Sequence, residues 1–209
     1  MSLTIAPIGP AFVAEVSGID MRTPPDAETV RAIVAANDTY AVLIFREQHI
    51  DDAQHVAFTR PFGRLETTIK AYRPGFVPRL AAEVADISNL DENGDILDAN
   101  DRRRMNSLGN RQWHTDYTFK ECAGKYSFLR ALVVTGEGGE TKFTDMRAAY
   151  DALSDKKKAE IADLVAEHSL VYSRGLIGFT DYAGIRVREN PVVSSLLAKL
   201  VRAGTFGIA

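Results

Sequence analysis

A histidine and an aspartate near the middle of the chain constrain its fold more than any other feature. They are His114 and Asp116, in the run Trp113-His114-Thr115-Asp116. On a β-strand, side chains two residues apart point to the same face. An imidazole and a carboxylate on one face are two of the three ligands in the 2-His-1-carboxylate site of non-haem Fe(II) oxygenases. If the motif is on a strand, this spacing therefore presents two metal ligands on one face.

The pair alone is a weak signal, because a His-x-Asp spacing also arises by chance. A structural histidine that is hydrogen-bonded to a nearby carboxylate is the alternative interpretation. The third metal ligand would be a second histidine, and His168 is the only histidine after Asp116 in the 209 residues. The surrounding sequence must therefore decide between the two interpretations.

Composition is that of an ordinary globular protein, with 45% hydrophobic and 25% charged residues. The net charge of −3 and the pI near 5.8 favour neither a nucleic acid nor an anionic membrane surface as a partner. We expect no signal peptide and no membrane span, because no apolar stretch is long enough. The single cysteine, Cys122, is typical of a reducing compartment. A cytoplasmic protein is therefore expected.

Hydrophobic periodicity predicts short strands with helices between them. Strands are expected within residues 3–16, 41–45, 84–90, 127–135 and 140–143, and loops over 66–83 and 95–106. Helices are expected from residue 26 to about 37, from 51 to about 61, from 145, from 154 through Val165, and over 190–204. This pattern predicts a mainly β fold with inserted helices, a sandwich or jelly roll.

Several runs of sequence resemble one family. They are Asn110 to Phe119, Gly138-Gly139-Glu140-Thr141, Ala41 to Arg46, Phe62-Gly63, Tyr72 to Phe76, and Thr144 to Tyr150. Over residues 3–182 the chain resembles the TauD/TfdA family of Fe(II)- and 2-oxoglutarate-dependent dioxygenases, and it is most similar to the 2,4-dichlorophenoxyacetate (TfdA-like) branch. The resemblance implies a double-stranded β-helix, or jelly roll, over residues 1–182.

The resemblance also implies roles for individual residues. His114 and Asp116 would bind Fe(II), and the Thr141 hydroxyl would hold a carboxylate of 2-oxoglutarate. Substrate-pocket positions fall on Asn110, Tyr117 and Phe119. Lys70 and Arg73 lie in the segment expected to meet an anionic substrate group, and the alternative, which the residue type alone favours, is that each is only a solvated cation.

An oxygenase reaction follows from these roles. The resemblance implies that O2 and 2-oxoglutarate are consumed, that a small anionic organic substrate is hydroxylated, and that succinate and CO2 are released. The substrate would be aryloxyalkanoate-like or a sulfonate. An apolar wall of Trp113 and Phe119 would keep water from the site, unless Trp113 simply packs in the core.

The chain also departs from the family pattern. The family has a distal histidine and an arginine near the C-terminus of a longer chain, and we find no counterpart for either in this sequence. His168 follows a predicted helix and matches a non-ligand position. Residues 183–209 form a divergent, helical tail in our prediction. We therefore expect a jelly roll that is incomplete at its C-terminus, with weak Fe(II) binding and impaired turnover.

Two other interpretations remain open at this stage. The chain could be a non-catalytic remnant that acts as a binding or assembly module and uses its C-terminal apolar stripe as an interface. Alternatively, a histidine from another subunit of a homo-oligomer could complete the iron site.

Overall fold

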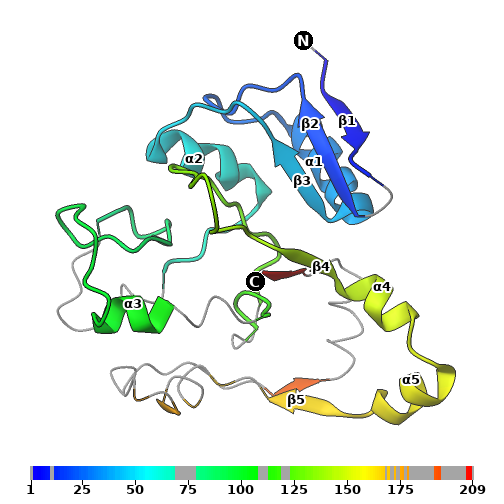
Figure 1. The fold of residues 1–209 in the computed structure, drawn as a ribbon. Coiled ribbons are helices and arrows are strands. Elements are labelled where there is room, and N and C mark those ends of the chain that lie inside the picture. Colours follow the sequence, from blue (N-terminus) through cyan, green and yellow to red (C-terminus); the bar gives the residue numbers. More distant parts are fainter. Residues whose placement is uncertain are drawn as a thin grey trace. The chain divides into compact units, whose positions relative to one another are not determined.

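In the computed structural model, the chain forms two compact units (Figure 1). The N-terminal unit comprises Met1–Thr67 and Phe128–Val134, and the motif unit comprises Thr68–Ser127 and Thr135–Ala209. The structure describes residues 2–9, 12–68, 79–107, 113–118, 123–167, 169, 172, 175–176, 178, 191–193 and 206–208. We describe each unit by itself.

The N-terminal unit contains a three-stranded sheet with the order β1-β2-β3. These strands are β1 (Thr4–Pro7), β2 (Val13–Ser17) and β3 (Val42–Phe45), with β1 antiparallel and β3 parallel to β2. A parallel pair needs a crossover connection. Helix α1 (Ala27–Tyr40) provides it and lies against the sheet (Figure 1).

Local capping chemistry fixes both helices of this unit. The Asp26 carboxylate accepts the backbone N–H of Thr29 at 2.8 Å and so begins α1. Helix α2 (Asp52–Thr59) begins with a capping box, in which Asp51 and Gln54 each bond the other's backbone N–H. It continues into a 3-10 turn, η1 (Arg60–Phe62), and ends at Gly63, whose φ of 145° disfavours other residues. The predicted helix starts are therefore confirmed.

An aromatic cluster forms the core of the N-terminal unit. Phe58 is fully buried, and its ring centroid lies 6.3 Å from that of Phe45 and 5.9 Å from that of Phe62. The ring of Phe128 lies 5.1 Å from that of Phe62 and brings a distant part of the sequence to the cluster. The Arg130 guanidinium donates to the Ile50 carbonyl oxygen and to the Asp52 carboxylate. Arg130 thus contacts the start of α2, and Phe128 packs against Phe62 beyond its end.

The motif unit consists of short elements. Its helices are α3 (Arg102–Ser107), α4 (Met146–Asp151) and α5 (Asp155–Ile161), and its described strands are β4 (Phe143–Asp145), β5 (Val165–Glu167), β6 (Pro191–Val193) and β7 (Phe206–Ile208). Strand β4 pairs antiparallel with β7, and β5 with β6. As predicted, Asp145 caps α4 and Ser154 caps α5.

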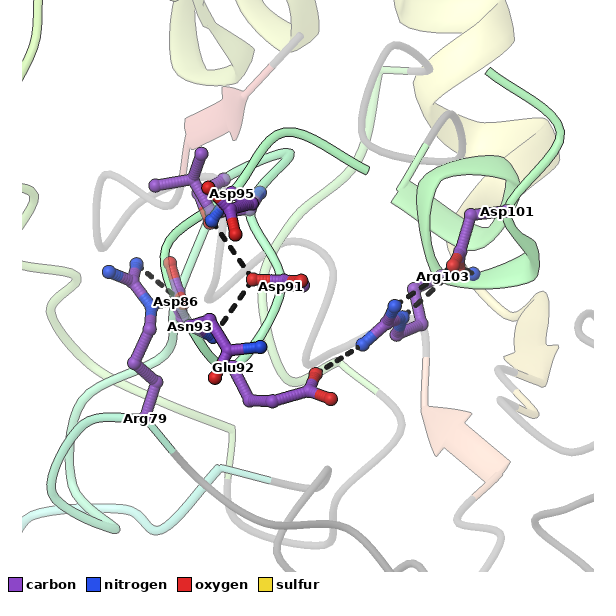
Figure 2. Close-up of polar contacts among 10 residues, drawn as sticks. Arg79, Asp86, Asp91, Glu92, Asn93, Asp95, Asp101 and Arg103 are labelled. Atoms are coloured by element: carbon purple, nitrogen blue, oxygen red, sulfur yellow. Dashed lines mark hydrogen bonds and ion pairs between the residues drawn. The ribbon is translucent and has the colours of Figure 1, made fainter. Parts of the chain in front are cut away.

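Ion pairs connect the acidic turn at residues 91–95 to α3 in this unit (Figure 2). The Asp91 carboxylate accepts the backbone N–H groups of Asn93 and Asp95, and these bonds help to lower its pKa. Arg103 of α3 pairs with Glu92 at 2.8 Å and with Asp101 at 2.9 Å. The segment that precedes the His-x-Asp motif therefore has local order, where the sequence predicted an irregular loop over residues 95–106.

Several predicted elements are wrong. Residues 127–135 form no strand, and over 84–90 the described structure has a single bridge, from Leu90 to Ile96. The helix that begins at residue 154 ends at Ile161, and Val165 lies in β5 instead. The helix predicted for residues 190–204 is wrong at Pro191–Val193, where β-branched valines favour the strand β6. The rest of that helix lies outside the described residues.

The described residues thus form small sheets accompanied by helices, which agrees with the predicted class in its coarser sense. No helix in the described part of the chain has the length and apolar character that crossing a membrane requires.

Candidate metal centre

The side chains of His114 and Asp116 converge in the motif unit. His114 Nε2 lies 3.4 Å from Asp116 Oδ1, and the two side chains are 33% and 35% exposed. Within residues 113–118, His114 makes a single β-bridge and residues 116–118 form a turn. The two potential ligands face one another, and both are partly exposed to solvent.

The second carboxylate oxygen of Asp116 has a different partner. Ser127 Oγ donates a hydrogen bond of 2.9 Å to Asp116 Oδ2. The two oxygens of one carboxylate therefore face two different groups, the imidazole on one side and the hydroxyl on the other. Sequence reasoning missed Ser127, because it placed this residue at the start of a strand and assigned it no contact.

The turn after the motif has a backbone conformation that is unusual for its residue type. Tyr117 has a φ of 56°, in the left-handed region that a bulky side chain rarely adopts. Its ring lies beside Gly124, where an added Cβ would be 3.7 Å from Tyr117 Cδ2. Thr118 Oγ1 donates to the Thr115 carbonyl oxygen at 3.4 Å within the same turn. Such conformations are found more often at functional sites.

The donor set suits a divalent first-row metal. A neutral imidazole nitrogen and a carboxylate oxygen are common ligands of Fe(II) and related ions. Two adjacent ligands with metal bonds of about 2.1 Å lie roughly 3 Å apart, and the observed separation of 3.4 Å is close to that value. Among the described residues no group of three His, Cys, Asp or Glu side chains could hold a metal. The residues present therefore fit as two ligands of an incomplete set.

The structure places only some of the other predicted site residues. Thr141 is exposed and follows a turn in which Gly138 and Gly139 have φ values of 75° and 78°. Trp113 is 57% exposed, so it does not pack in the core. Asn110, Phe119, Lys70, Arg73 and His168 lie outside the described residues.

Sequence comparison connects this site to known proteins. A family model for the taurine catabolism dioxygenase TauD, TfdA family, matches residues 4–200. The match extends past residue 182, where the sequence resemblance was expected to end, and the boundary of the tail stays a prediction.

Two curated relatives act on aryloxyalkanoates by name. The chain is 39% identical over 194 residues to the alpha-ketoglutarate-dependent 2,4-dichlorophenoxyacetate dioxygenase of Cupriavidus pinatubonensis, covering 93% of this chain and 68% of the relative. It is 35% identical over 204 residues to the (S)-phenoxypropionate/alpha-ketoglutarate-dioxygenase of Sphingobium herbicidovorans, covering 94% and 66%.

A solved structure shares the fold. The crystal structure of AAD-2 in complex with Mn(II) and N-oxalylglycine matches with a TM-score of 0.76 and 42% sequence identity. The match covers 92% of this chain and 65% of that one. The chain therefore spans about two thirds of the length of the proteins it matches.

Proposed function

This chain belongs to the TauD/TfdA family of dioxygenases, and on that premise we propose that it binds Fe(II) through His114 and Asp116 and uses 2-oxoglutarate and O2 to hydroxylate a small anionic organic molecule. One observation carries the proposal: His114 Nε2 and Asp116 Oδ1 converge to 3.4 Å. The AAD-2 complex with Mn(II) and N-oxalylglycine supports the choice of metal and cosubstrate.

We propose that the framework of the site is a double-stranded β-helix. The TM-score of 0.76 against the crystal structure of AAD-2 supports this assignment. In such a framework loops at one end of the strands carry functional residues. The exposed position of Trp113 beside the motif is compatible with a wall of the site.

Each ligand atom has a defined task in the proposed site. His114 presents a lone pair from Nε2, which requires the imidazole to be neutral and its proton to be on Nδ1. Asp116 supplies a negative charge from Oδ1, which stabilises a bound cation. With Fe(II), 2-oxoglutarate and O2 bound, the site would convert a substrate C–H bond to C–OH, with succinate and CO2 as the other products.

Thr141 is proposed to hold 2-oxoglutarate. Its exposed hydroxyl can donate a hydrogen bond to a carboxylate of the cosubstrate. Because a hydroxyl bond to a charged acceptor contributes about 1.5–3 kcal/mol, Thr141→Val should raise the KM for 2-oxoglutarate about tenfold or more. The matched control is Thr4→Val, at an exposed position of β1 in the other unit.

The proposed substrate carries a carboxylate or a sulfur oxyanion. The names of the relatives support this class, since they include a phenoxypropionate dioxygenase and a sulfate ester dioxygenase. Lys70 and Arg73 are proposed to bind the anionic group. Asn110, Tyr117 and Phe119 are proposed to line the pocket around the rest of the molecule.

Turnover by the 209-residue chain alone is proposed to be slow. The described residues supply two metal ligands, and two ligands orient the remaining coordination positions less well than three. Succinate release with 2,4-dichlorophenoxyacetate, Fe(II) and 2-oxoglutarate tests the function. Slow release that requires His114 supports it, whereas equal release by the parent chain and by His114→Ala would refute it. Fast release by the parent chain would refute the proposed impairment.

A non-catalytic binding module is the second proposal, favoured by the lack of a third ligand among the described residues. A homo-oligomer in which another copy completes the site belongs to the first proposal. Measurement of the oligomeric mass with and without Mn(II) separates them. His114→Ala should leave the mass of a module unchanged, but should remove any metal-dependent assembly.

The single cysteine in the sequence supports the further proposal of a reducing, cytoplasmic compartment.

A further inference from the structure

The two oxygens of the Asp116 carboxylate face different groups. Oδ1 lies 3.4 Å from His114 Nε2, and Oδ2 accepts a 2.9 Å hydrogen bond from Ser127 Oγ. All three side chains belong to the motif unit. A hydrogen bond to one oxygen opposes rotation of the carboxylate about its Cβ–Cγ bond. The other oxygen is thereby kept on the side of the imidazole.

We propose that Ser127 is a positioning residue that makes Asp116 a one-oxygen metal ligand. This inference rests on the proposed function, because it assumes that the cation binds between His114 and Asp116. Carboxylates bind cations through one oxygen or through both. With Oδ2 engaged by the Ser127 hydroxyl, Oδ1 is the oxygen left for the cation.

The chemistry of a serine suits this role. A hydroxyl is a neutral donor, so it orients the carboxylate without cancelling the negative charge that attracts the cation. A lysine or an arginine in the same place would compete electrostatically with the metal. Groups that hydrogen-bond to metal ligands commonly tune metal affinity in this way.

The arrangement also affects the number of open coordination positions. A carboxylate that binds through both oxygens occupies two positions on the metal, whereas one that binds through a single oxygen occupies one. Because Ser127 engages Oδ2, a cation bound by Asp116 would have one more position available for a chelating cosubstrate.

Substitution of Ser127 tests the inference on the full 209-residue chain. Ser127→Ala removes the donor, and Ser127→Thr retains a hydroxyl. Ser17→Ala, at the exposed end of β2 in the other unit, is the matched control. His114→Ala reports on the metal site itself. Binding of Co(II) alone is measured by calorimetry, the Co(II) visible spectrum reports coordination, and thermal unfolding of the metal-free chain reports the fold.

Ser127→Ala is expected to weaken Co(II) binding about tenfold, in the range for partners of metal ligands, and to change the Co(II) spectrum. Ser127→Thr and Ser17→Ala should bind like the parent chain. Metal-free unfolding should be unchanged in all three, since the Ser127 side chain is exposed.

Three outcomes would overturn the inference. If Ser127→Ala binds Co(II) like the parent while His114→Ala does not, the role of Ser127 is wrong and the metal site stands. If Ser127→Ala loses affinity together with thermal stability, and Ser127→Thr does not restore both, the residue is structural. If the parent chain does not bind Co(II), or if His114→Ala binds it equally well, both the inference and the proposed site fall.

Discussion

The two units of this chain differ in what they bury and in what they expose. In the N-terminal unit Phe58, Val16 and Ala14 are at most 2% exposed. In the motif unit, Leu97 is the one hydrophobic residue of the described part that is buried, while Trp113 and Ile96 are 57% and 73% exposed. The unit with the packed core carries none of the predicted metal ligands. The packed core and the proposed metal site therefore lie in different parts of the sequence, as is common when loops carry a site.

Removal of the central aromatic ring should have the largest effect on the folded state. Phe58→Ala is expected to lower the free energy of unfolding by about 3–5 kcal/mol, because it leaves a cavity in the core. Phe143→Ala, at a position that is 37% exposed in the motif unit, is the matched control and should cost far less. Urea unfolding measures both. If both variants lose the same free energy of unfolding, the two units do not differ in packing as described.

Loss of the negative charge of Asp116 should weaken metal binding without changing the stability of the fold. Asp116→Asn is expected to weaken Mn(II) binding by roughly 100-fold or more, beyond the usual effect of removing a partner of a metal ligand. Asp163→Asn, at an exposed position in the same unit, is the control. Calorimetric titration and urea unfolding are measured together. Unchanged Mn(II) affinity would remove Asp116 from the site.

Removal of the ion pair between Arg130 and Asp52 of α2 should have an intermediate effect on stability. The Arg130 side chain is 14% exposed and pairs with Asp52, so Arg130→Ala is expected to cost about 2 kcal/mol of stability. Arg130→Lys should recover part of this loss. Arg22→Ala, whose side chain is 65% exposed in an ion pair with Asp20, should have little effect in urea unfolding. If the two alanine variants behave alike, the contacts of Arg130 with Ile50 and Asp52 do not contribute to stability as described.

The smallest predicted effect is on how the free energy of unfolding depends on pH, through His55 of the N-terminal unit. Burial, reinforced by the positive charge of Arg130, lowers the pKa of His55, with Asp52 opposing. The unfolded chain then binds a proton more readily, so stability falls as pH drops through about 6.5, the unfolded value, towards the lower pKa of the folded state.

His55→Gln should flatten this slope when unfolding is measured at several pH values between 5 and 8. His49→Gln is the control, because His49 is 89% exposed. A slope that survives in His55→Gln would show that another group titrates.

A second contrast, between local and long-range interactions, explains which structural features could be predicted from the sequence. Asp26, Asp51, Asp145 and Ser154 all cap helices as expected, because a cap is a local interaction between neighbouring residues. Strands need distant partners. Residues 127–135 have the composition of a strand but form none, and Leu132, Val133 and Val134 are 64%, 85% and 83% exposed.

The site could be predicted in part. The family was identified from short runs around His114 and Thr141, and the family model confirms that identification. The hydrogen bond from Ser127 to Asp116 was not predicted, because it joins residues that are 11 positions apart without a local pattern. The roles of Lys70, Arg73, Asn110, Tyr117 and Phe119 stay predictions.

Binding of Mn(II) to the parent chain and to His114→Ala, with and without 2-oxoglutarate, is the most direct test of the iron site. The signal of free Mn(II) in electron paramagnetic resonance reports how much metal the protein holds. We predict that the parent chain retains Mn(II), that 2-oxoglutarate tightens this binding, and that His114→Ala retains little in either condition. Equal retention of Mn(II) by the parent and by His114→Ala would contradict the assignment of His114 as a metal ligand.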